Sequence, residues 1–141
     1  MNGTEKDRSF LLDTSALLAY WFDEKGADEV ERILRTGSLA KKIYISFMTV
    51  MEAKYQLWRH AGKEAAEEFE RIVRNLPITR LDVTDPILNR ASEIKASARL
   101  SVADSWIIAT AIESGSTLVH KDPEFEQVKD RVSLISLPYK K

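Results

Sequence analysis

The sequence predicts an α/β fold, a three-layer α/β/α sandwich with a central, mostly parallel sheet. Short apolar segments alternate with longer segments of helical periodicity along the chain. Parallel neighbours need crossover connections, and most crossovers are helical. The length of 141 residues is typical of one domain. We therefore expect a single domain over residues 1–141, with a flexible N-terminal lead at 1–8 and a C-terminal tail at 138–141.

The first half of the chain predicts two strands and four helices. The second helix has Val30, Ile33 and Leu34 at helical spacing and Gly37 as a stop, and Gly62 ends the third helix. Because each strand is followed by a helix, the order favours parallel crossover units. The predicted elements are strand 10–12, helix 16–22, helix 27–35, strand 43–46, helix 47–60 and helix 64–76.

The second half continues the same alternation. Pro77 breaks the preceding helix, and Asp85 followed by Pro86 is typical of a helix cap and first helical position. Gly115 ends a later helix, and Pro138 follows what we expect to be an edge strand. The predicted elements are strand 78–83, helix 86–98, helix 101–113, strand 117–120 and strand 132–137.

Composition narrows the classes of function. Hydrophobic residues make up 44% and charged residues 30%, which indicates a folded, water-exposed domain. No apolar run is long enough to cross a membrane and residues 1–8 lack a signal peptide's apolar stretch, so we expect a cytoplasmic protein. The absence of cysteine excludes disulfides, thiolate zinc sites and cysteine nucleophiles. The net charge of -1 does not by itself indicate nucleic-acid binding.

Four carboxylates fall at corresponding places in the predicted elements. Asp13 ends the first strand, Glu52 lies early in the helix after the second strand, Asp104 lies in the first turn of its helix, and Asp122 follows strand 117–120. In an open parallel sheet, strand carboxyl ends and the following helix starts share one edge. We therefore expect these four side chains to face one crevice.

Each acid also has an ordinary structural interpretation as a helix cap. Capping does not explain why four carboxylates share one crevice, where they would repel one another without protons or a cation. Oxygen ligands favour hard cations, so the pattern predicts Mg²⁺ or Mn²⁺ in preference to zinc. The capping alternatives are Asp13 alone, Thr49 with Glu52, Ser101 with Asp104, and Asp122 with Pro123.

Four segments in this order resemble the motifs of the PIN-domain family. The segment 100–111, LSVADSWIIATA, is similar to the signature in which alanine and aspartate open a helix. The segments 12–15 (LDTS), 50–52 (VME) and 117–125 (TLVHKDPEF) resemble the first-strand, helix-acid and final-strand motifs. One departure is His120, which stands where the family often has threonine or serine and leaves substrate contacts there open. The resemblance runs from about residue 10 to residue 137.

This resemblance implies a PIN-like fold and a metal-dependent endoribonuclease, and chains of this length resemble VapC-like toxins of toxin–antitoxin pairs. It implies that Asp13 and Asp104 are the main metal ligands, with Asp122 adding direct or water-bridged ligation. Glu52 would hold a second ion or orient water, and Ser15 would support the scissile phosphate or a water. The expected partners are RNA, a small antitoxin protein and a second copy in a homodimer, and the expected products carry 5′-phosphate and 3′-hydroxyl ends.

Basic and aromatic side chains are candidates for holding RNA by phosphate contact and base stacking. The same residue types more often form a solvated surface or the core. We expect His60 to lie at the surface and treat His120 as a candidate for substrate contact. The candidates are the basic residues Lys41, Lys42, Lys54, Arg59, Arg99 and Lys121 and the aromatic residues Tyr20, Trp21, Tyr55, Trp58 and Trp106.

Two other functions fit part of the pattern. A catalytically silent PIN module could serve as a protein-binding or scaffold domain, although it would not need four acids. A phosphoacceptor receiver domain also places acids at a parallel sheet edge. It would need paired acids after the first strand, where Thr14 and Ser15 follow Asp13 instead.

Overall fold

The computed structural model describes residues 8–37 and 42–139. Most of the expected N-terminal lead and the candidate Lys41 therefore lie outside the described residues. The strands are β1 (Ser9–Leu12), β2 (Lys42–Ser46), β3 (Thr79–Leu81), β4 (Thr117–His120) and β5 (Leu134–Ser136). The helices are α1 (Thr14–Trp21), α2 (Ala27–Gly37), α3 (Phe47–Ala61), α4 (Lys63–Arg74), α5 (Asp85–Ser97), α6 (Val102–Ser114) and the 3₁₀ helix η2 (Pro123–Val128).

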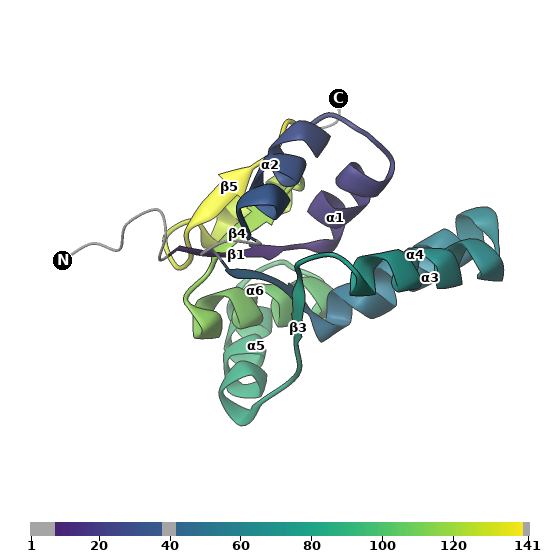
Figure 1. Ribbon diagram of the computed structural model, residues 1–141. Coiled ribbons are helices and arrows are strands. Elements are labelled where there is room, and N and C mark those ends of the chain that lie inside the picture. Colours follow the sequence, from purple (N-terminus) through teal and green to yellow (C-terminus); the bar gives the residue numbers. More distant parts are fainter. Residues whose placement is uncertain (1–7, 38–41, 140–141) are drawn as a thin grey trace.

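The five strands form one sheet in the order β3-β2-β1-β4-β5, and all neighbouring pairs are parallel. This confirms the predicted fold class and places β5 at an edge, as expected. Helices α1 and α2 cover one side of the sheet and α5 and α6 the other, while α3 and α4 form a hairpin that extends beyond the sheet (Figure 1). Strands β1 to β4 each lead into a helix at their carboxyl ends, and because the strands are parallel these ends gather at one edge.

The central strand β1 is buried on both faces, as a parallel strand covered by helices should be. Phe10 and Leu12 pack into a core with α1, α2 and the α3–α4 hairpin. Leu11 points the other way, into a second core that includes Ile107 and Ile108 of α6. The two cores explain why this strand is a continuous apolar run in the sequence instead of an alternating one.

The edge strands are shorter than the predicted ranges 78–83 and 132–137. Leu81 of β3 pairs with Ser46, the last residue of β2, and Ser136 of β5 pairs with His120, the last residue of β4. Beyond these pairs the inner strands have already turned into the next segment. An edge strand ends where its only neighbour ends.

Helix starts follow the local side chains. Thr84, and not Asp85, caps α5, because the Thr84 hydroxyl accepts a hydrogen bond from the Ile87 N–H at 3.3 Å. Helix α3 is capped by Ser46, which accepts from the Met48 N–H at 3.0 Å, so Thr49 and Glu52 do not form its capping box. Helix α6 ends at Gly115, whose φ of 67° is the left-handed geometry that glycine adopts without strain.

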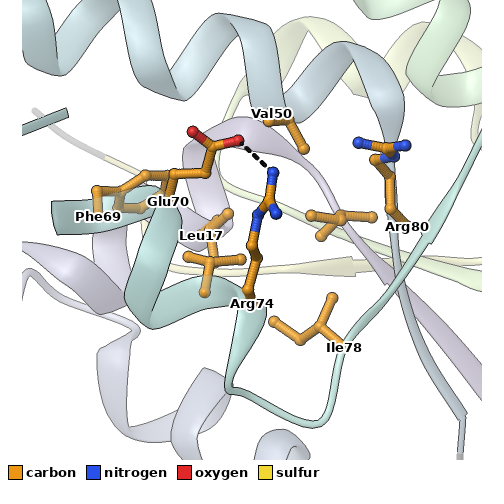
Figure 2. A pocket seen from close by; sticks show the side chains of 9 residues that line it. Leu17, Val50, Phe69, Glu70, Arg74, Ile78 and Arg80 are labelled. Atoms are coloured by element: carbon orange, nitrogen blue, oxygen red, sulfur yellow. Dashed lines mark hydrogen bonds and ion pairs between the residues drawn. The ribbon is translucent and has the colours of Figure 1, made fainter. Parts of the chain in front are cut away.

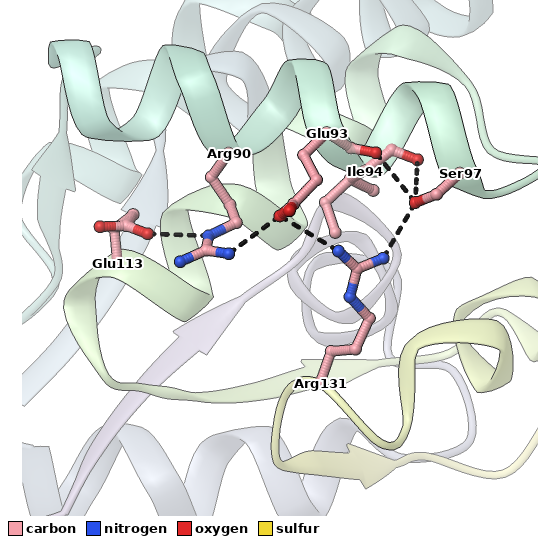
Figure 3. Close-up of polar contacts among 6 residues, drawn as sticks. All are labelled: Arg90, Glu93, Ile94, Ser97, Glu113 and Arg131. Carbon is pink, nitrogen blue, oxygen red and sulfur yellow. Dashed lines mark hydrogen bonds and ion pairs between the residues drawn. The ribbon is translucent and has the colours of Figure 1, made fainter.

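A network of paired charges joins α5 and α6 to the segment before β5 (Figure 3). Arg90 contacts Glu113 and Glu93, each at 2.9 Å, and Arg131 contacts Glu93 at 3.2 Å. Arg131 also donates to the Ser97 hydroxyl at 3.0 Å. We call Arg90, Glu93, Glu113 and Arg131 the balanced network because its two positive and two negative groups neutralise one another.

Within the described part of the chain, no helix has the length and apolar character that crossing a membrane would require.

Candidate active site

Asp13 lies at the point where β1 passes into α1. Its side chain is 3% exposed. As the cap of α1 it accepts a hydrogen bond from the Ala16 N–H at 2.7 Å and from the Ser15 hydroxyl at 2.8 Å. Burial, with the nearby charges of Asp104 and Asp122, nevertheless raises the pKa of Asp13 to about 8. The capping interpretation is therefore confirmed, but the local hydrogen bonds do not compensate for its burial.

Ser15 connects Asp13 to the end of β4. Its hydroxyl donates to the Asp13 carboxylate and accepts the Lys121 N–H at 2.9 Å. These two bonds fix the rotamer of Asp13 relative to the segment that carries Asp122. The geometry makes Ser15 a positioning residue for a carboxylate.

Asp104 enters from the other side of the sheet, in the first turn of α6. Ser101 caps this helix by accepting the Asp104 N–H at 3.0 Å, which confirms half of the predicted capping box. Burial raises the pKa of Asp104 to about 6, and the charges of Glu52, Asp122 and Glu124 act in the same direction. Three other acids, Glu52, Asp122 and Glu124, therefore act on the pKa of Asp104.

Asp122 and Glu124 follow β4, at the start of η2. Asp122 caps this short helix, accepting the Glu124 N–H at 2.9 Å, with Pro123 in the first turn as expected. Oxygen atoms of Asp104, Asp122 and Glu124 all lie within 4.8 Å of one another. Asp13 and Glu52 are not part of this closest group among the described residues.

Glu124 was not among the four acids predicted from the sequence. In the sequence it has the usual features of an acid in the first turn of a helix, where acids are common. The available signal was its spacing, because an acid two residues after Asp122 in a tight turn can share the same ion. The short 3₁₀ geometry of η2, which brings Glu124 back toward Asp104, is not evident from the residues themselves.

Glu52 lies in α3 and reaches the site from the hairpin side. Its carboxylate accepts a hydrogen bond from the Thr14 hydroxyl at 2.7 Å, and the Thr14 hydroxyl lies 3.3 Å from the Thr49 hydroxyl. Thr14 leaves the second carboxylate oxygen of Glu52 available for another partner. The polar contact with α1 also explains why Thr14 and Thr49 are buried.

We call Asp13, Glu52, Asp104, Asp122 and Glu124 the acidic cluster. No lysine or arginine within residues 8–37 and 42–139 forms an ion pair with any of these carboxylates. A divalent cation fits this set, because its members are all hard oxygen ligands and three of them already share a small space. Burial is the main cause of the raised pKa values of Asp13 and Asp104, and repulsion from the neighbouring acids adds to it.

His120 is fully buried, so it does not reach a substrate in this conformation. Its ring lies 5.2 Å from the ring of Phe125 and 6.1 Å from that of Tyr139. Its Nδ1 accepts the Asp122 N–H at 3.3 Å, whereas its Nε2 is buried and has no hydrogen-bond partner in the described residues. Burial lowers the pKa of His120, which favours the neutral ring. Through this hydrogen bond, His120 holds the backbone of Asp122 in place.

Several candidate substrate contacts are wrong in detail. The Lys121 side chain is 4% exposed and binds the Lys25 carbonyl at 2.8 Å, so it faces inward. Lys54 is paired with Glu70 at 2.9 Å. Lys42 begins β2 and lies at the sheet edge opposite the acids. The position of Lys42 follows from the direction of β2, whereas the partners of Lys54 and Lys121 lie in other segments of the chain, which sequence position alone does not reveal.

The remaining basic and aromatic candidates divide by exposure. Trp21 packs edge-on against Phe69, with ring centres 4.9 Å apart, and Trp106 packs against Phe47, which indicates core roles for both tryptophans. Exposed candidates remain in three places, since Arg59 and Arg99 are at the surface and an exposed aromatic stripe runs along α3. That stripe contains Tyr55 and Trp58, which are 41% and 48% exposed.

An apolar cavity lies away from the acids, between α1, α3, α4 and the strands β2 and β3. The cavity has a volume of about 180 Å³. Figure 2 shows Leu17, Val50 and Phe69 among the residues that line it. The Glu70 carboxylate beside it binds Arg74 at 3.0 Å and Lys54 at 2.9 Å. These contacts lower the pKa of Glu70, the opposite of what occurs at Asp13 and Asp104.

The fold and the site together define a class: an α/β domain with carboxylates gathered at the carboxyl edge of a parallel sheet. A family model described as PIN domain matches residues 10–131. The chain therefore belongs to the PIN domain family. Among curated protein sequences, none matches this chain.

Solved structures with the same fold come from bacterial toxin–antitoxin systems. VapBC2 from Rickettsia felis, bound to a DNA fragment from its promoter, has a chain with TM-score 0.75 and 17% identity, covering 92% of this chain and 99% of that one. DNA-bound VapBC from Salmonella typhimurium has a chain with TM-score 0.72 and 20% identity, and the match covers 92% of this chain and 98% of that one. VapC20 from Mycobacterium tuberculosis is a toxin that cleaves the sarcin–ricin loop. Its TM-score is 0.67 and its identity 19%, and the match covers 84% of this chain and 94% of that one. At these identities the likeness concerns the fold.

Proposed function

We propose that this protein is a metal-dependent endoribonuclease and the toxin of a toxin–antitoxin pair. The observation that carries the proposal is the acidic cluster. Its carboxylates converge from both sides of the sheet, without a paired cation among the described side chains. Membership of the PIN domain family and the shared fold with VapC20, a toxin that cleaves RNA, support the same conclusion.

The proposed cation is Mg²⁺ or Mn²⁺, held by Asp104 and Asp122 together with Asp13, and with Glu124 as a further ligand. When bound, such a cation neutralises phosphate charge and makes water easier to deprotonate. Ser15 keeps the Asp13 carboxylate in place, and His120 keeps the Asp122 backbone in place. Glu52, held by Thr14 through one oxygen, has the second oxygen available for a second ion or for orienting the attacking water.

The overall reaction is hydrolysis of one phosphodiester bond. The oxygen of water bonds to phosphorus, the bond from phosphorus to the 3′ oxygen breaks, and that oxygen takes a proton. The products are a 5′-phosphate and a 3′-hydroxyl end. Arg99 is our candidate for holding a neighbouring phosphate, because it is exposed and its backbone is fixed next to η2 by Gln127 at 2.9 Å.

The proposed protein partners are a small antitoxin and a second copy of the chain, and the proposed place of action is the cytoplasm. Support for the antitoxin comes from neighbours that are toxin–antitoxin complexes. Support for the homodimer is the exposed apolar surface at Met51, Tyr55 and Trp58, which lie at helical spacing on α3. Tyr20 and Trp21, which the sequence analysis named as candidates for base stacking, are partly buried and pack against the core.

The test is digestion of total RNA with purified protein, in Mg²⁺, in Mn²⁺ and in EDTA, followed by mapping of the cut ends. We expect cleavage only with the cation, at few sites, with 5′-phosphate and 3′-hydroxyl products. Cleavage that survives EDTA and dialysis would overturn the metal role. A folded protein that binds Mg²⁺ but cleaves no RNA would instead favour the silent module.

A further inference from the structure

A groove leads away from the acidic cluster between α1 and α3. Ser15 and Leu18 of α1, and Phe22 at its carboxyl-terminal cap, are spaced three and four residues apart, so they lie on one side of the helix. They line a hollow of about 340 Å³ together with Asp122 and with Gln56 of α3. Because seven residues of helix span about 10 Å, this face reaches from the acids to the far end of α1. We call this hollow the α1/α3 groove.

The opposite wall follows the same direction. Glu52, Gln56 and His60 recur every four residues along α3, which also places them on one face. Glu52 belongs to the acidic cluster, and Gln56 is one turn farther out. A second hollow of about 410 Å³ shares Phe22 and Gln56 with the groove and ends at His60. The two hollows therefore form one path that starts at the acids.

Apart from Asp122, which belongs to the acidic cluster, Lys121 and Glu24 are the charged residues that line the groove, and they are paired with each other. Lys121 Nζ lies 3.5 Å from the Glu24 carboxylate and binds the Lys25 carbonyl. What remains for a ligand is the Phe22 side chain, 45% exposed, and the Gln56 amide, which makes no hydrogen bond within the described residues. An aromatic wall beside an open amide is suited to a flat, uncharged molecule that has both hydrogen-bond donors and acceptors on its edge.

We infer that the α1/α3 groove is a nucleobase subsite, which takes one base of the RNA next to the bond being cut. Phe22 provides a stacking surface, and Gln56 contacts the edge of the base. The inference rests on the proposed function, since the groove shares Ser15 and Asp122 with the acidic cluster and so continues the path of the substrate. Gln56 is then a specificity-determining residue.

The first test needs no cleavage. The chain has two glutamines, Gln56 and Gln127, and the Gln127 amide is occupied by the Arg99 and Glu124 carbonyls, each at 3.1 Å. In EDTA, titration of ¹⁵N-labelled protein with AMP, CMP, GMP and UMP should move the Gln56 side-chain signals for at least one nucleotide and leave those of Gln127 in place. Gln56→Leu assigns the signals by removing them. Signals of Gln56 that no nucleotide moves would overturn the inference and leave the groove to a protein partner.

The second test uses cleavage of a randomised RNA pool. Gln56→Leu keeps the side-chain size but removes both hydrogen-bonding groups, and should weaken the base preference at one position beside the cut by roughly ten-fold. Gln56→Glu should change which base is preferred, and Phe22→Ala should weaken binding of every base. The matched control is Asn89→Leu, which removes an exposed amide from a hollow of about 340 Å³ on α5.

The two proposals fail in different ways. Base preferences that stay unchanged in Gln56→Leu and Phe22→Ala, with cleavage intact, would overturn the subsite and leave the nuclease. Wild-type protein that cuts no RNA, while its Gln56 signals respond to nucleotides, would overturn the nuclease and support the subsite.

Discussion

The acidic cluster and the balanced network contain similar residues but opposite arrangements of charge. In the balanced network each carboxylate faces an arginine at 2.9 to 3.2 Å on a largely open surface. In the acidic cluster five carboxylates face one another, and burial raises the pKa of Asp13 to about 8. Paired charge on a surface contributes modestly to stability, whereas unpaired carboxylates in a crevice oppose folding and are typical of a functional site. We propose that a cation offsets this repulsion in the acidic cluster.

The largest expected effect is loss of RNA cleavage in Asp104→Asn. Asparagine keeps the shape and the N–H contact with Ser101 but removes the carboxylate charge of Asp104 from the acidic cluster. A cation's charge stabilisation is worth several kcal/mol, so we expect a decrease in rate of about 100-fold or more. Asp130→Asn, at an exposed aspartate after η2, is the matched control. Wild-type rates in Asp104→Asn at saturating Mg²⁺ would place the active site elsewhere.

The second effect is stabilisation by the cation. Mg²⁺ at about one hundred times its dissociation constant should raise the free energy of unfolding by roughly 2.7 kcal/mol, if it binds only the native state. This gain should shrink sharply in Asp13→Asn, whose melting temperature in EDTA should exceed that of the wild type. Four melting curves, for both proteins with and without Mg²⁺, measure this. A lower melting temperature in EDTA for the variant, with equal Mg²⁺ shifts, would make Asp13 only a helix cap.

The difference in stability between the wild type and Asp13→Asn should also depend on pH. Burial raises the pKa of Asp13 from 3.8 to about 8, so the native state holds a proton that the unfolded chain releases. The wild type should therefore lose stability relative to Asp13→Asn as pH rises from 3.8 to about 8, with no further change above. Denaturant unfolding in EDTA across this range measures the difference. A difference that is constant with pH would show that Asp13 is ionised at no cost.

A smaller effect is expected for Glu124, the acid that the sequence analysis did not include. Glu124→Gln keeps the N–H contact with Asp122 but replaces one of the three carboxylates whose oxygens lie within 4.8 Å by an uncharged amide. We expect Mn²⁺ affinity to fall by about ten-fold, less than in Asp104→Asn. Calorimetric titration measures both affinities. Equal affinities in Glu124→Gln and wild type would remove Glu124 from the site.

The smallest effect is expected in the balanced network. Glu93→Gln removes two exposed ion pairs, with Arg90 and Arg131, and should lower the melting temperature by no more than a few degrees. RNA cleavage and the Mg²⁺ shift should be unchanged, because the network joins α5, the carboxyl end of α6 and the segment before β5, whereas Asp104 lies in the first turn of α6. A loss of RNA cleavage as large as that of an acidic-cluster variant would contradict this prediction, because it would show that the balanced network is also needed for activity.

The sequence is enough to predict the bounds of an element when those bounds follow from the element's own residues. Strand β4 has the predicted bounds, because its four residues are all buried. The limits of β3 and β5 could not be predicted, since they depend on where β2 and β4 end. Parallel topology predicts one shared edge for Asp13, Glu52, Asp104 and Asp122, and the structure places all four there.

The features that the sequence could not predict depend on where side chains point and which groups they contact. The inward turn of Lys121 depends on a carbonyl ninety-six residues away in sequence, at Lys25. The role of Ser15 depends on the Lys121 N–H, and the burial of His120 depends on Phe125 and Tyr139. Each is a tertiary contact between segments that no local pattern links.

Direct binding of Mn²⁺, followed by the loss of its free-ion electron paramagnetic resonance signal, tests the central claim that the acidic cluster is a cation site. The wild type should remove Mn²⁺ from solution saturably, Mg²⁺ should compete, and Asp104→Asn should bind at least about ten-fold more weakly with its fold intact by circular dichroism. Equal Mn²⁺ affinity in wild type and Asp104→Asn would contradict the claim.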